Sequence, residues 1–536
     1  MDAHTADLVV IGSGGGGLLA ACVAADAGHR VLVLERTPFL GGTTAISGGM
    51  IWVPDNPLMA AAGFPDSAAD ALRYLRLVTE GTVADEHLEQ FVGKSPEMVR
   101  YLLSRTPAGL FPISRPDYHP DWPGAREGGR TLDNAPFPAA PEVRARIRSG
   151  SAFPPLTYDE LHRARWDPGA YRALIARREA TGMLTVGAAL VAALVTACDD
   201  RGVEFRTGTR ARRLRTEGAR ITGVLAETDG SPVTFRATAG VVLASGGFEW
   251  NARLKQAFLG KPDTVAVSPP YNHGDGQVMA AEAGAALGNL SEAWWAPVVS
   301  APEECYDGEP RARHIVAERC LPGSIMVNRA GRRFVNEAVN YNDITKALHV
   351  LEPSAHRRPN DPAWLVFDEG FRRRYPIAGV APTAPPPSWF ATGGSLTELA
   401  KAIDVDADAL TRTVETFNRG ARDGVDPEFG RGGSAHDRYY GDGERPGNPC
   451  LAPLEEPPYF AVEVRPGTLG TKGGVVTDVD GRVLRYDDEP IPGLFACGNV
   501  TASVMGPGYP GSGGTLGPAL LGGYLCGKTA SGKETP

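Results

Sequence analysis

The stretches that decide the fold are DLVVIGSGGGG at residues 7–17 and VLVLE at residues 31–35, separated by an Ala- and Leu-rich segment. They predict a strand, a glycine turn, a helix and a second strand. Gly12, Gly14 and Gly17 fill the three glycine positions of a dinucleotide-binding turn, where they permit the tight turn, the approach of a pyrophosphate and close helix packing. Glu35 ends the second strand, where an acid binds ribose hydroxyls. We therefore expect an α/β fold with a Rossmann-like nucleotide-binding domain.

Two further glycine-rich stretches belong with this motif. Residues 41–49, GGTTAISGG, are small and hydroxylated, which suits a loop lying along a flavin. Residues 508–518, GYPGSGGTLGP, predict a helix start with Pro518 at the first helical position. Such a helix end offers free N–H groups and partial positive charge to an anion. Just before it, Tyr509 stands where its hydroxyl could hold a substrate oxygen.

Composition excludes several classes of protein. The chain has 536 residues and a net charge of −9, without a Lys/Arg-rich tract, which argues against nucleic acid and membrane-surface partners. No apolar run approaches the length of a membrane span, and the first strand begins too near Met1 for a signal peptide. The seven scattered cysteines form no CxxC pair, and the ten histidines show no ligand spacing. We expect a reduced, cytoplasmic enzyme without a metal.

The order of patterns along the chain predicts two domains. Strand and helix patterns alternate up to the buried strand at residues 240–244, which indicates a parallel sheet. Residues 107–155, rich in Pro, Gly and Arg, predict a long irregular loop of the kind that forms lids, and residues 423–447 predict an exposed loop. We expect residues 1–280 and 454–536 to form the nucleotide-binding domain, and residues 281–453 an inserted mixed α/β catalytic domain that caps the substrate.

Most of the chain resembles the flavoprotein superfamily of succinate dehydrogenase and fumarate reductase. The resemblance rests on the opening motif, on residues 41–49, on VVLASGGFE at 241–249, on Gly274-Asp275-Gly276 and on Gly498-Asn499. It implies FAD as cofactor. Members with covalent flavin carry a histidine after the second strand; here none lies between His29 and His87, so we expect non-covalent FAD. The implied FAD-binding residues are Gly12, Gly14, Gly15, Gly17, Glu35, Arg36, Gly42, Thr43, Thr44, Ser47, Gly48, Gly49, Ala211, Ser245, Gly246, Gly498, Asn499, Thr515 and Leu516.

Within this superfamily the chain resembles 3-ketosteroid Δ1-dehydrogenases. Four stretches carry this resemblance: residues 47–54, 469–474, 498–506 and 509–515. Dicarboxylate-specific members need arginines that pair with carboxylates, and no arginine follows Arg485. The resemblance implies removal of two hydrogens next to a ring ketone, with the hydride passing to flavin N5.

The family's site residues carry over position by position. Tyr509 matches the tyrosine that holds the ketone oxygen, and Gly513 the glycine whose N–H assists it. Tyr341 matches the catalytic base, and Tyr118 the tyrosine that hydrogen-bonds to that base. Asn340 departs from the pattern, because the steroid enzymes usually have proline before the base.

Three alternatives stay open. The first is an FAD-dependent alkene reductase, of the enone or fumarate type, that runs the same chemistry backward. The second is a desaturase of a non-steroid cyclic ketone. A flavin-binding protein without activity is the third, although it would not need Tyr509 and Gly513 before the closing helix. Since no second dinucleotide motif is present for NAD(P)H, we expect an external electron acceptor such as a quinone or oxygen.

Overall fold

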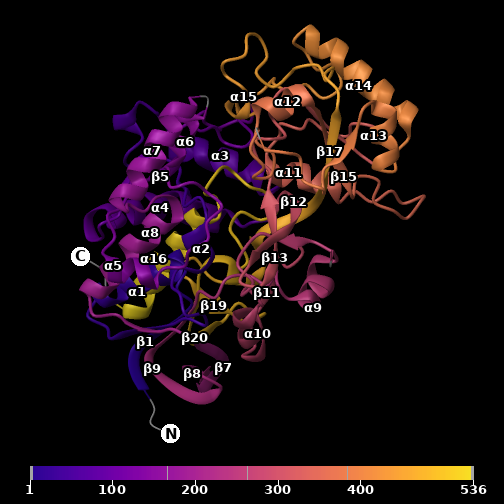
Figure 1. The fold of residues 1–536 in the computed structure, drawn as a ribbon. Coiled ribbons are helices and arrows are strands. Elements are labelled where there is room, and N and C mark those ends of the chain that lie inside the picture. Colours follow the sequence, from indigo (N-terminus) through magenta and orange to yellow (C-terminus); the bar gives the residue numbers. More distant parts are fainter. Residues whose placement is uncertain (1–3, 166, 262, 383, 533–536) are drawn as a thin grey trace.

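The computed structural model describes residues 4–165, 167–261, 263–382 and 384–532. Figure 1 shows two lobes. The N-terminal and C-terminal parts of the chain lie together in one, and the middle of the chain forms most of the other. The long strand β17 (Tyr459–Thr471) runs from the second lobe toward the first. The predicted mixed α/β architecture is confirmed.

The first lobe is organised around an eight-stranded sheet whose main path runs β19-β20-β9-β1-β2-β6. From β20 to β6 all neighbours on this path are parallel, as predicted. The strands β7 and β8 instead form an antiparallel hairpin beside β9, so the sheet is mixed. The strands are β1 (His4–Ile11), β2 (Val31–Leu34), β6 (Glu204–Arg206), β7 (Thr209–Glu217), β8 (Arg220–Thr228), β9 (Ser231–Leu243), β19 (Arg482–Leu484) and β20 (Pro490–Ala496).

Apolar helices cover this sheet. Helix α1 (Gly15–Asp26) packs against α8 (Val186–Asp200) and along α16 (Leu516–Ser531). The contact with α16 is close because a Cβ on Gly523 would lie 2.1 Å from the Gly16 carbonyl oxygen. The other helices of this lobe are α2 (Gly42–Ile46), α3 (Ala68–Val78), α4 (Asp85–Arg105), α5 (Pro141–Arg146), α6 (Tyr158–Ala164), α7 (Pro168–Thr181) and α10 (Asp275–Glu282).

The second lobe contains a seven-stranded sheet, which we call the cap sheet, with main path β13-β12-β17-β15-β14. Its strands are β10 (Val265–Ala266), β12 (Ala293–Tyr306), β13 (Glu309–His314), β14 (Ser324–Val327), β15 (Ala363–Asp368), β16 (Ala391–Gly393) and β17. Its helices are α9 (Ala252–Leu254), α11 (Tyr341–Leu348), α12 (Glu369–Arg374), α13 (Leu396–Ala402), α14 (Ala407–Arg422) and α15 (Ala435–Tyr440). The domain boundaries near residues 280 and 453 stay a prediction.

Two segments expected to be irregular are ordered into elements. Residues 107–155 contain β4 (Leu110–Pro112), β5 (Thr131–Asn134) and α5, and β5 pairs with both β4 and β3 (Ile51–Trp52). Residues 423–447 contain α15, and Arg431 within them is buried. Gly and Pro suggested loops, but tertiary hydrogen bonds organise both segments. The short strands β11 (Leu287–Gly288) and β18 (Gly474–Val475) form a separate two-stranded antiparallel sheet.

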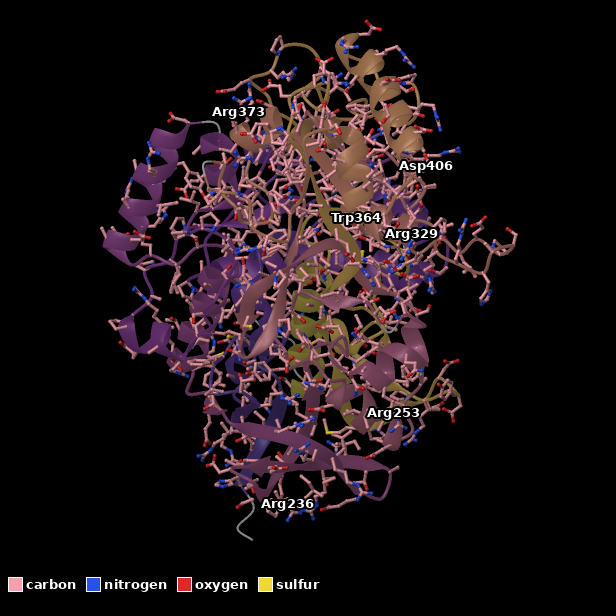
Figure 2. All side chains as sticks on the ribbon, turned by 45° about the vertical axis from the view of Figure 1, so that its right-hand side comes forward. Arg236, Arg253, Arg329, Trp364, Arg373 and Asp406 are labelled. Atoms are coloured by element: carbon pink, nitrogen blue, oxygen red, sulfur yellow. The ribbon has the colours of Figure 1, made fainter. Side chains whose placement is uncertain are left out.

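Charged side chains mark the outside of both lobes. Figure 2 shows Arg236 at one end of the molecule and Arg373 and Asp406 on the cap lobe. Trp294 and Trp295, in contrast, are buried in β12. In the described part of the chain, none of the helices has both the length and the apolar character of a membrane span.

Candidate functional site

The predicted nucleotide-binding residues converge at one edge of the first sheet. Gly12 follows β1, Glu35 follows β2, Ser245 and Gly246 follow β9, and Gly498 follows β20. These four strands are parallel neighbours, so their carboxyl ends meet. Ligands of such sheets bind outside the carboxyl ends of the strands. We call this group of residues the nucleotide edge.

The glycine turn has the spacing that a pyrophosphate needs. Gly12 has φ +105°, and a Cβ there would lie 2.4 Å from the Ala244 carbonyl oxygen. A Cβ on Gly17 would lie 2.2 Å from the Gly12 carbonyl oxygen. At Gly14 the nearest atom would be the Thr44 hydroxyl at 3.6 Å. The first and third glycines are therefore required by the fold, whereas the middle one leaves its backbone accessible.

Glu35 organises this turn as well as standing at its edge. One carboxylate oxygen accepts from the Ser13 hydroxyl at 2.7 Å, and the other from the Thr37 N–H at 2.9 Å. The Ser13 hydroxyl in turn accepts from the Gly41 N–H at 3.0 Å. Glu35 is buried. Its carboxylate thus connects the glycine turn with the segment after β2.

That segment differs from the expected loop, since residues 42–46 form helix α2. The Thr44 hydroxyl accepts from the Gly15 N–H at 3.1 Å, which fixes α2 beside the start of α1. Thr43 accepts from Asn272 at 3.2 Å. Asn272 also donates to the buried carboxylate of Glu249 at 2.7 Å. Small residues here serve close packing of helices; their spacing alone does not distinguish a loop from a short helix.

The remaining predicted nucleotide-binding residues lie around this edge. Arg36 donates to the Tyr271 carbonyl at 2.7 Å and lies 3.4 Å from the Asp275 carboxylate. Asp275 also pairs with Arg210 at 2.7 Å. Ala211, next to Arg210, is buried in β7. The Asn499 side chain accepts from the Trp294 indole at 3.0 Å. Ser47, Gly48 and Gly49 follow α2, and the Cβ space of Gly48 is filled by the Tyr158 ring.

Helix α16 begins at Leu516 with Thr515 as its N-cap, so the expectation that Pro518 is the first helical residue is wrong. Proline is tolerated in the first turn because the N–H groups there have no partner within the helix. Thr515 carries no side-chain cap bond. Its hydroxyl instead lies 2.9 Å from the Tyr509 hydroxyl, which links the helix start to the candidate catalytic residues.

Tyr118, Tyr341 and Tyr509 come together from three distant segments, and we call them the tyrosine cluster. Their ring centroids lie 5.2 Å apart for Tyr118–Tyr341, 5.2 Å for Tyr118–Tyr509 and 5.4 Å for Tyr341–Tyr509, all edge to face. All three are buried. The Tyr118 hydroxyl also lies 3.1 Å from the Ser512 hydroxyl.

Backbone contacts hold these segments against each other. The Pro510 carbonyl accepts from the Tyr118 N–H at 3.0 Å and from the Tyr74 hydroxyl at 2.6 Å. Gly513 has φ +96°, and its carbonyl accepts from the Trp52 N–H at 3.1 Å. A Cβ on Gly513 would lie 2.5 Å from that nitrogen. The stretch around Tyr509 is thus fixed to the segment of Tyr118 and to β3.

Tyr341 is the first residue of α11, and Asn340 is its N-cap. The Asn340 side-chain oxygen accepts from the Asp343 N–H at 3.0 Å. This explains the departure at position 340 as a capping residue. Arg319, fully buried, donates to the Val339 carbonyl at 2.6 Å and so holds the chain just before the cap.

Burial raises the pKa of each of the three tyrosines. For Tyr341, the neighbouring rings of Tyr118 and Tyr509 and the hydrogen bonds with them raise the pKa further. The Arg115 guanidinium acts in the opposite direction on the pKa of Tyr118 and Tyr509. His314, edge to face with Tyr341 at 4.6 Å, is kept neutral, because burial lowers its pKa to about 3.

Comparison with known proteins shows which family this chain belongs to. Residues 7–516 match the family model described as an FAD binding domain. The chain is 42% identical to 4-oxocyclohexanecarboxylate 2-dehydrogenase of Sinomonas cyclohexanicum, covering 99% of this chain and 93% of that protein. It is 37% identical to 3-oxosteroid 1-dehydrogenase of Mycolicibacterium smegmatis, covering 97% and 96%. The crystal structure of 3-ketosteroid delta1-dehydrogenase from Sterolibacterium denitrificans with 1,4-androstadiene-3,17-dione superposes with a TM-score of 0.92, at 37% identity, over 99% of this chain and 100% of that one.

The chain belongs to the 3-ketosteroid Δ1-dehydrogenase family. It is an FAD-dependent dehydrogenase. The nucleotide edge fits this cofactor: Gly14, the N-cap of α1, has no side chain to fill the space before the helix, and a Cβ there would meet no atom nearer than 3.6 Å. When bound, FAD supplies the flavin N5 that accepts a hydride. That the chain holds it without a covalent bond stays a prediction.

Several residues beside the family's tyrosines escaped the sequence-based reasoning. The fully buried Lys472 donates to the Gly508 carbonyl at 2.7 Å, and its ammonium lies 4.6 Å from the ring centre of Trp294. Trp294 contacts Tyr509 at 4.7 Å between ring centres. His436, in the segment expected to be an exposed loop, contacts Tyr118 at 5.4 Å. Lys472 stands in a stretch quoted for the resemblance, but its role needed the fold.

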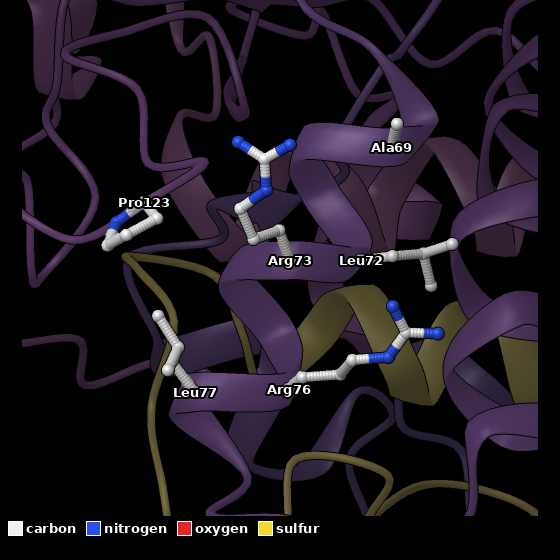
Figure 3. Close-up of a pocket in the computed structure, with 6 residues that line it drawn as sticks. All are labelled: Ala69, Leu72, Arg73, Arg76, Leu77 and Pro123. Carbon is white, nitrogen blue, oxygen red and sulfur yellow. The ribbon is translucent and has the colours of Figure 1, made fainter.

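A hollow on the outside of α3 is separate from this site. Figure 3 shows its residues, and Tyr74 of the same helix is not among them, because it is buried toward Pro510. The hollow is lined by Ala69, Leu72, Arg73, Arg76, Leu77 and Pro123. None of the tyrosine cluster contributes to it, so we assign it no part in the reaction.

Proposed function

We propose that this dehydrogenase introduces a carbon–carbon double bond next to the carbonyl of a ring ketone, of the kind found in 3-ketosteroids and oxocyclohexanes. The observation that carries the proposal is the tyrosine cluster, in which Tyr341 packs against Tyr509 and the Tyr509 hydroxyl lies 2.9 Å from that of Thr515 at the start of α16. The relatives named after ring ketones support it. A ketone acidifies its α C–H because the carbanion becomes an enolate, so the site needs an oxygen donor and a base.

Each residue of the cluster has one role in this proposal. The Tyr509 hydroxyl, assisted by the Gly513 N–H, donates to the ketone oxygen and stabilises the enolate. Tyr341 takes the α-proton, while the hydride leaves the β carbon for the flavin. The substrate loses two hydrogens in total, and an external acceptor such as a quinone or oxygen would have to take up the two electrons. We keep this acceptor, and a cytoplasmic location, as predictions of the sequence.

A buried phenol is a poor base, and its raised pKa makes this step demanding. We propose that Tyr341 gives its own phenolic proton to Tyr118 as it accepts the α-proton, while Tyr118 gives up its proton toward the Ser512 hydroxyl, so that one proton leaves along this chain for each one taken from the ketone. A hydroxyl relay spares the site an isolated buried phenolate. The activity should therefore rise with pH above neutrality, because the raised pKa keeps the base protonated over most of that range.

The test is anaerobic mixing of the purified enzyme with saturated ring ketones while the flavin absorbance is followed. Bleaching by a ring ketone supports dehydrogenation. If no ketone bleaches the flavin, and enones reoxidise the reduced enzyme instead, the chain is a reductase and the proposal is wrong.

The same preparation tests how FAD is held. We expect denaturation to release all the yellow colour into the supernatant, since no histidine follows β2 up to His87. Colour that stays with the precipitated chain would contradict non-covalent binding.

A further inference from the structure

Arg115 is a buried cation that the roles above do not use. Its side chain is 4% exposed. The guanidinium carbon lies 4.8 Å from the ring centre of Tyr158, 5.4 Å from that of Tyr439 and 5.2 Å from that of Tyr440. Its Nη1 lies 3.3 Å from the Met50 sulfur, and its Nη2 donates to the Tyr440 hydroxyl. Aromatic rings and a thioether thus surround the charge.

No carboxylate of the described residues forms an ion pair with Arg115, and its buried Nε has no hydrogen-bond partner. Two other buried arginines are paired with carboxylates instead. Arg130 pairs with Asp66 at 2.7 Å, and Arg333 with Glu337 at 2.7 Å. A buried charge without a counter-charge is costly. Phenol and thioether acceptors are weak substitutes, so the guanidinium has capacity left for an anion.

One carboxylate that interacts electrostatically with Arg115 already has other hydrogen-bond partners. Asp133 interacts electrostatically with Arg115, but its carboxylate accepts the N–H groups of Asn134 at 2.8 Å and Asp159 at 3.1 Å. Burial raises the pKa of Asp133 to about 6, and no ion pair of the described residues joins its carboxylate to Arg115. Asp133 therefore leaves Arg115 unpaired.

Arg115 stands next to the site of the chemistry. It precedes Tyr118 by three residues, and His436 bridges the two sides, with ring centres 5.4 Å from Tyr118 and 5.2 Å from Tyr440. Met50 follows the predicted FAD-binding residues 47–49, which brings the guanidinium close to the cofactor side as well. The cation therefore lies between the cap helix α15, the segment after α2 and the tyrosine cluster.

We propose that Arg115 recognises a carboxylate on the substrate, so that the enzyme acts on ring ketones that carry an acid group on the ring, with the ketone at the tyrosine cluster and the carboxylate at the guanidinium. This rests on the proposed function and narrows its substrate class. A carboxylate supplies two acceptors in the plane of the guanidinium and a full counter-charge. The 42% identical relative named for 4-oxocyclohexanecarboxylate is consistent with such a substrate.

The experiment compares three substrates with the FAD-loaded enzyme: 4-oxocyclohexanecarboxylate, its methyl ester and a 3-ketosteroid without an acid group. The ester keeps the ring and the ketone but lacks the charge. We expect the wild-type enzyme to prefer the acid over the ester in kcat/KM. In Arg115→Met this preference should fall by about 30-fold or more, which is what truncating one partner of a buried charge pair costs. The acid-over-ester preference of Arg115→Lys should lie between those of the wild type and of Arg115→Met.

Arg178→Met is the matched control. Arg178 is also buried and also near a methionine sulfur, but it pairs with Glu160. Its acid-to-ester ratio should stay as in the wild type. The acid-to-ester ratio is informative even if Arg115→Met binds less FAD, because both substrates are measured on the same fraction of FAD-loaded enzyme. Arg115→Lys gives a second variant, which preserves the charge.

The outcomes separate the two proposals. Equal losses on acid and ester in Arg115→Met would overturn carboxylate recognition and assign Arg115 to the tyrosines or the fold. Oxidation of the 3-ketosteroid but not of the acid by the wild type would overturn it too, while the proposed function stands. If none of the three substrates bleaches the wild-type flavin, the proposed function itself fails.

Discussion

The nucleotide edge and the tyrosine cluster lie side by side but are built differently. The nucleotide edge depends mainly on backbone geometry: Gly12 and Gly17 leave no room for a Cβ, and the N-cap of α1 is Gly14, which has no side chain. In the tyrosine cluster, three side chains from segments more than 150 residues apart meet in a buried place. The difference predicts separable failures. Changes in the cluster should stop the chemistry with FAD in place, whereas changes at the edge should loosen FAD from an otherwise competent site.

The largest effect is expected from Tyr341→Phe. It removes the proposed base but keeps the ring that packs against Tyr118 and His314. Positioned proton transfer contributes on the order of 10²–10⁴-fold to a rate. The rate of anaerobic flavin reduction should therefore fall by roughly 10²-fold or more. Ketone binding should be nearly unchanged, because no bond to the carbonyl is lost. A variant that still reduces its flavin near the wild-type rate would place the base elsewhere.

Tyr509→Phe should come next, with a different signature. Loss of one donor to a developing oxyanion costs roughly 10²–10³-fold in turnover. Because Tyr509 is assigned to the ketone oxygen, this variant should also bind phenol-like enolate mimics more weakly, which Tyr341→Phe should not. The control is Tyr101→Phe, which removes a buried hydroxyl that donates to Asp26 at 2.7 Å, outside the cluster. If both cluster variants bind the mimics alike, the division of roles is wrong.

The contrast also explains what the sequence could predict. The first sheet and its glycine turn follow from local spacing, since residues 4–35 form one contiguous strand–helix–strand unit. Tyr509 could be singled out from its place before the closing helix, but Tyr118 and Tyr341 only through resemblance to a family, because spacing says nothing about which distant loops meet. Arg115 and His436 were not singled out as site residues at all. Their segments are rich in Gly and Arg together with Pro or Asp, a composition typical of loops, and only tertiary contacts reveal their burial.

Glu35→Ala tests the edge and should act on FAD affinity. Hydrogen bonds to a charged group contribute about 1.5–3 kcal/mol, equivalent to roughly 10- to 150-fold in Kd. Because Glu35 also accepts from Ser13 and Thr37, part of the loss will come from a loosened turn. Flavin reduction by enzyme saturated with FAD should change little. Titration of apoenzyme with FAD, together with kinetics at saturating FAD, separates the two. Equal affinity in the variant would remove Glu35 from the binding site.

The smallest effect is expected where the two regions join, at Lys472. The ammonium donates to the Pro507 and Gly508 carbonyls and so holds the chain before Tyr509. Burial lowers its pKa to about 7 in the folded enzyme, against about 10.4 in the unfolded chain. Between these values the unfolded state binds more protons, so the stability contributed at this site rises with pH, by at most about 1.4 kcal/mol per pH unit.

Comparison with Lys472→Met isolates the contribution of Lys472 to the pH dependence of stability, because every other titrating group is common to both proteins. The stability of the wild type relative to Lys472→Met should therefore increase by about 2 kcal/mol between about pH 7.5 and about pH 9. Urea denaturation of the two FAD-loaded proteins at both pH values measures it. A difference that stays constant would mean that Lys472 remains charged at both pH values. The cation would then be stabilised by the two carbonyls and the Trp294 face, and the cluster would be joined to the nucleotide edge through a permanent charge.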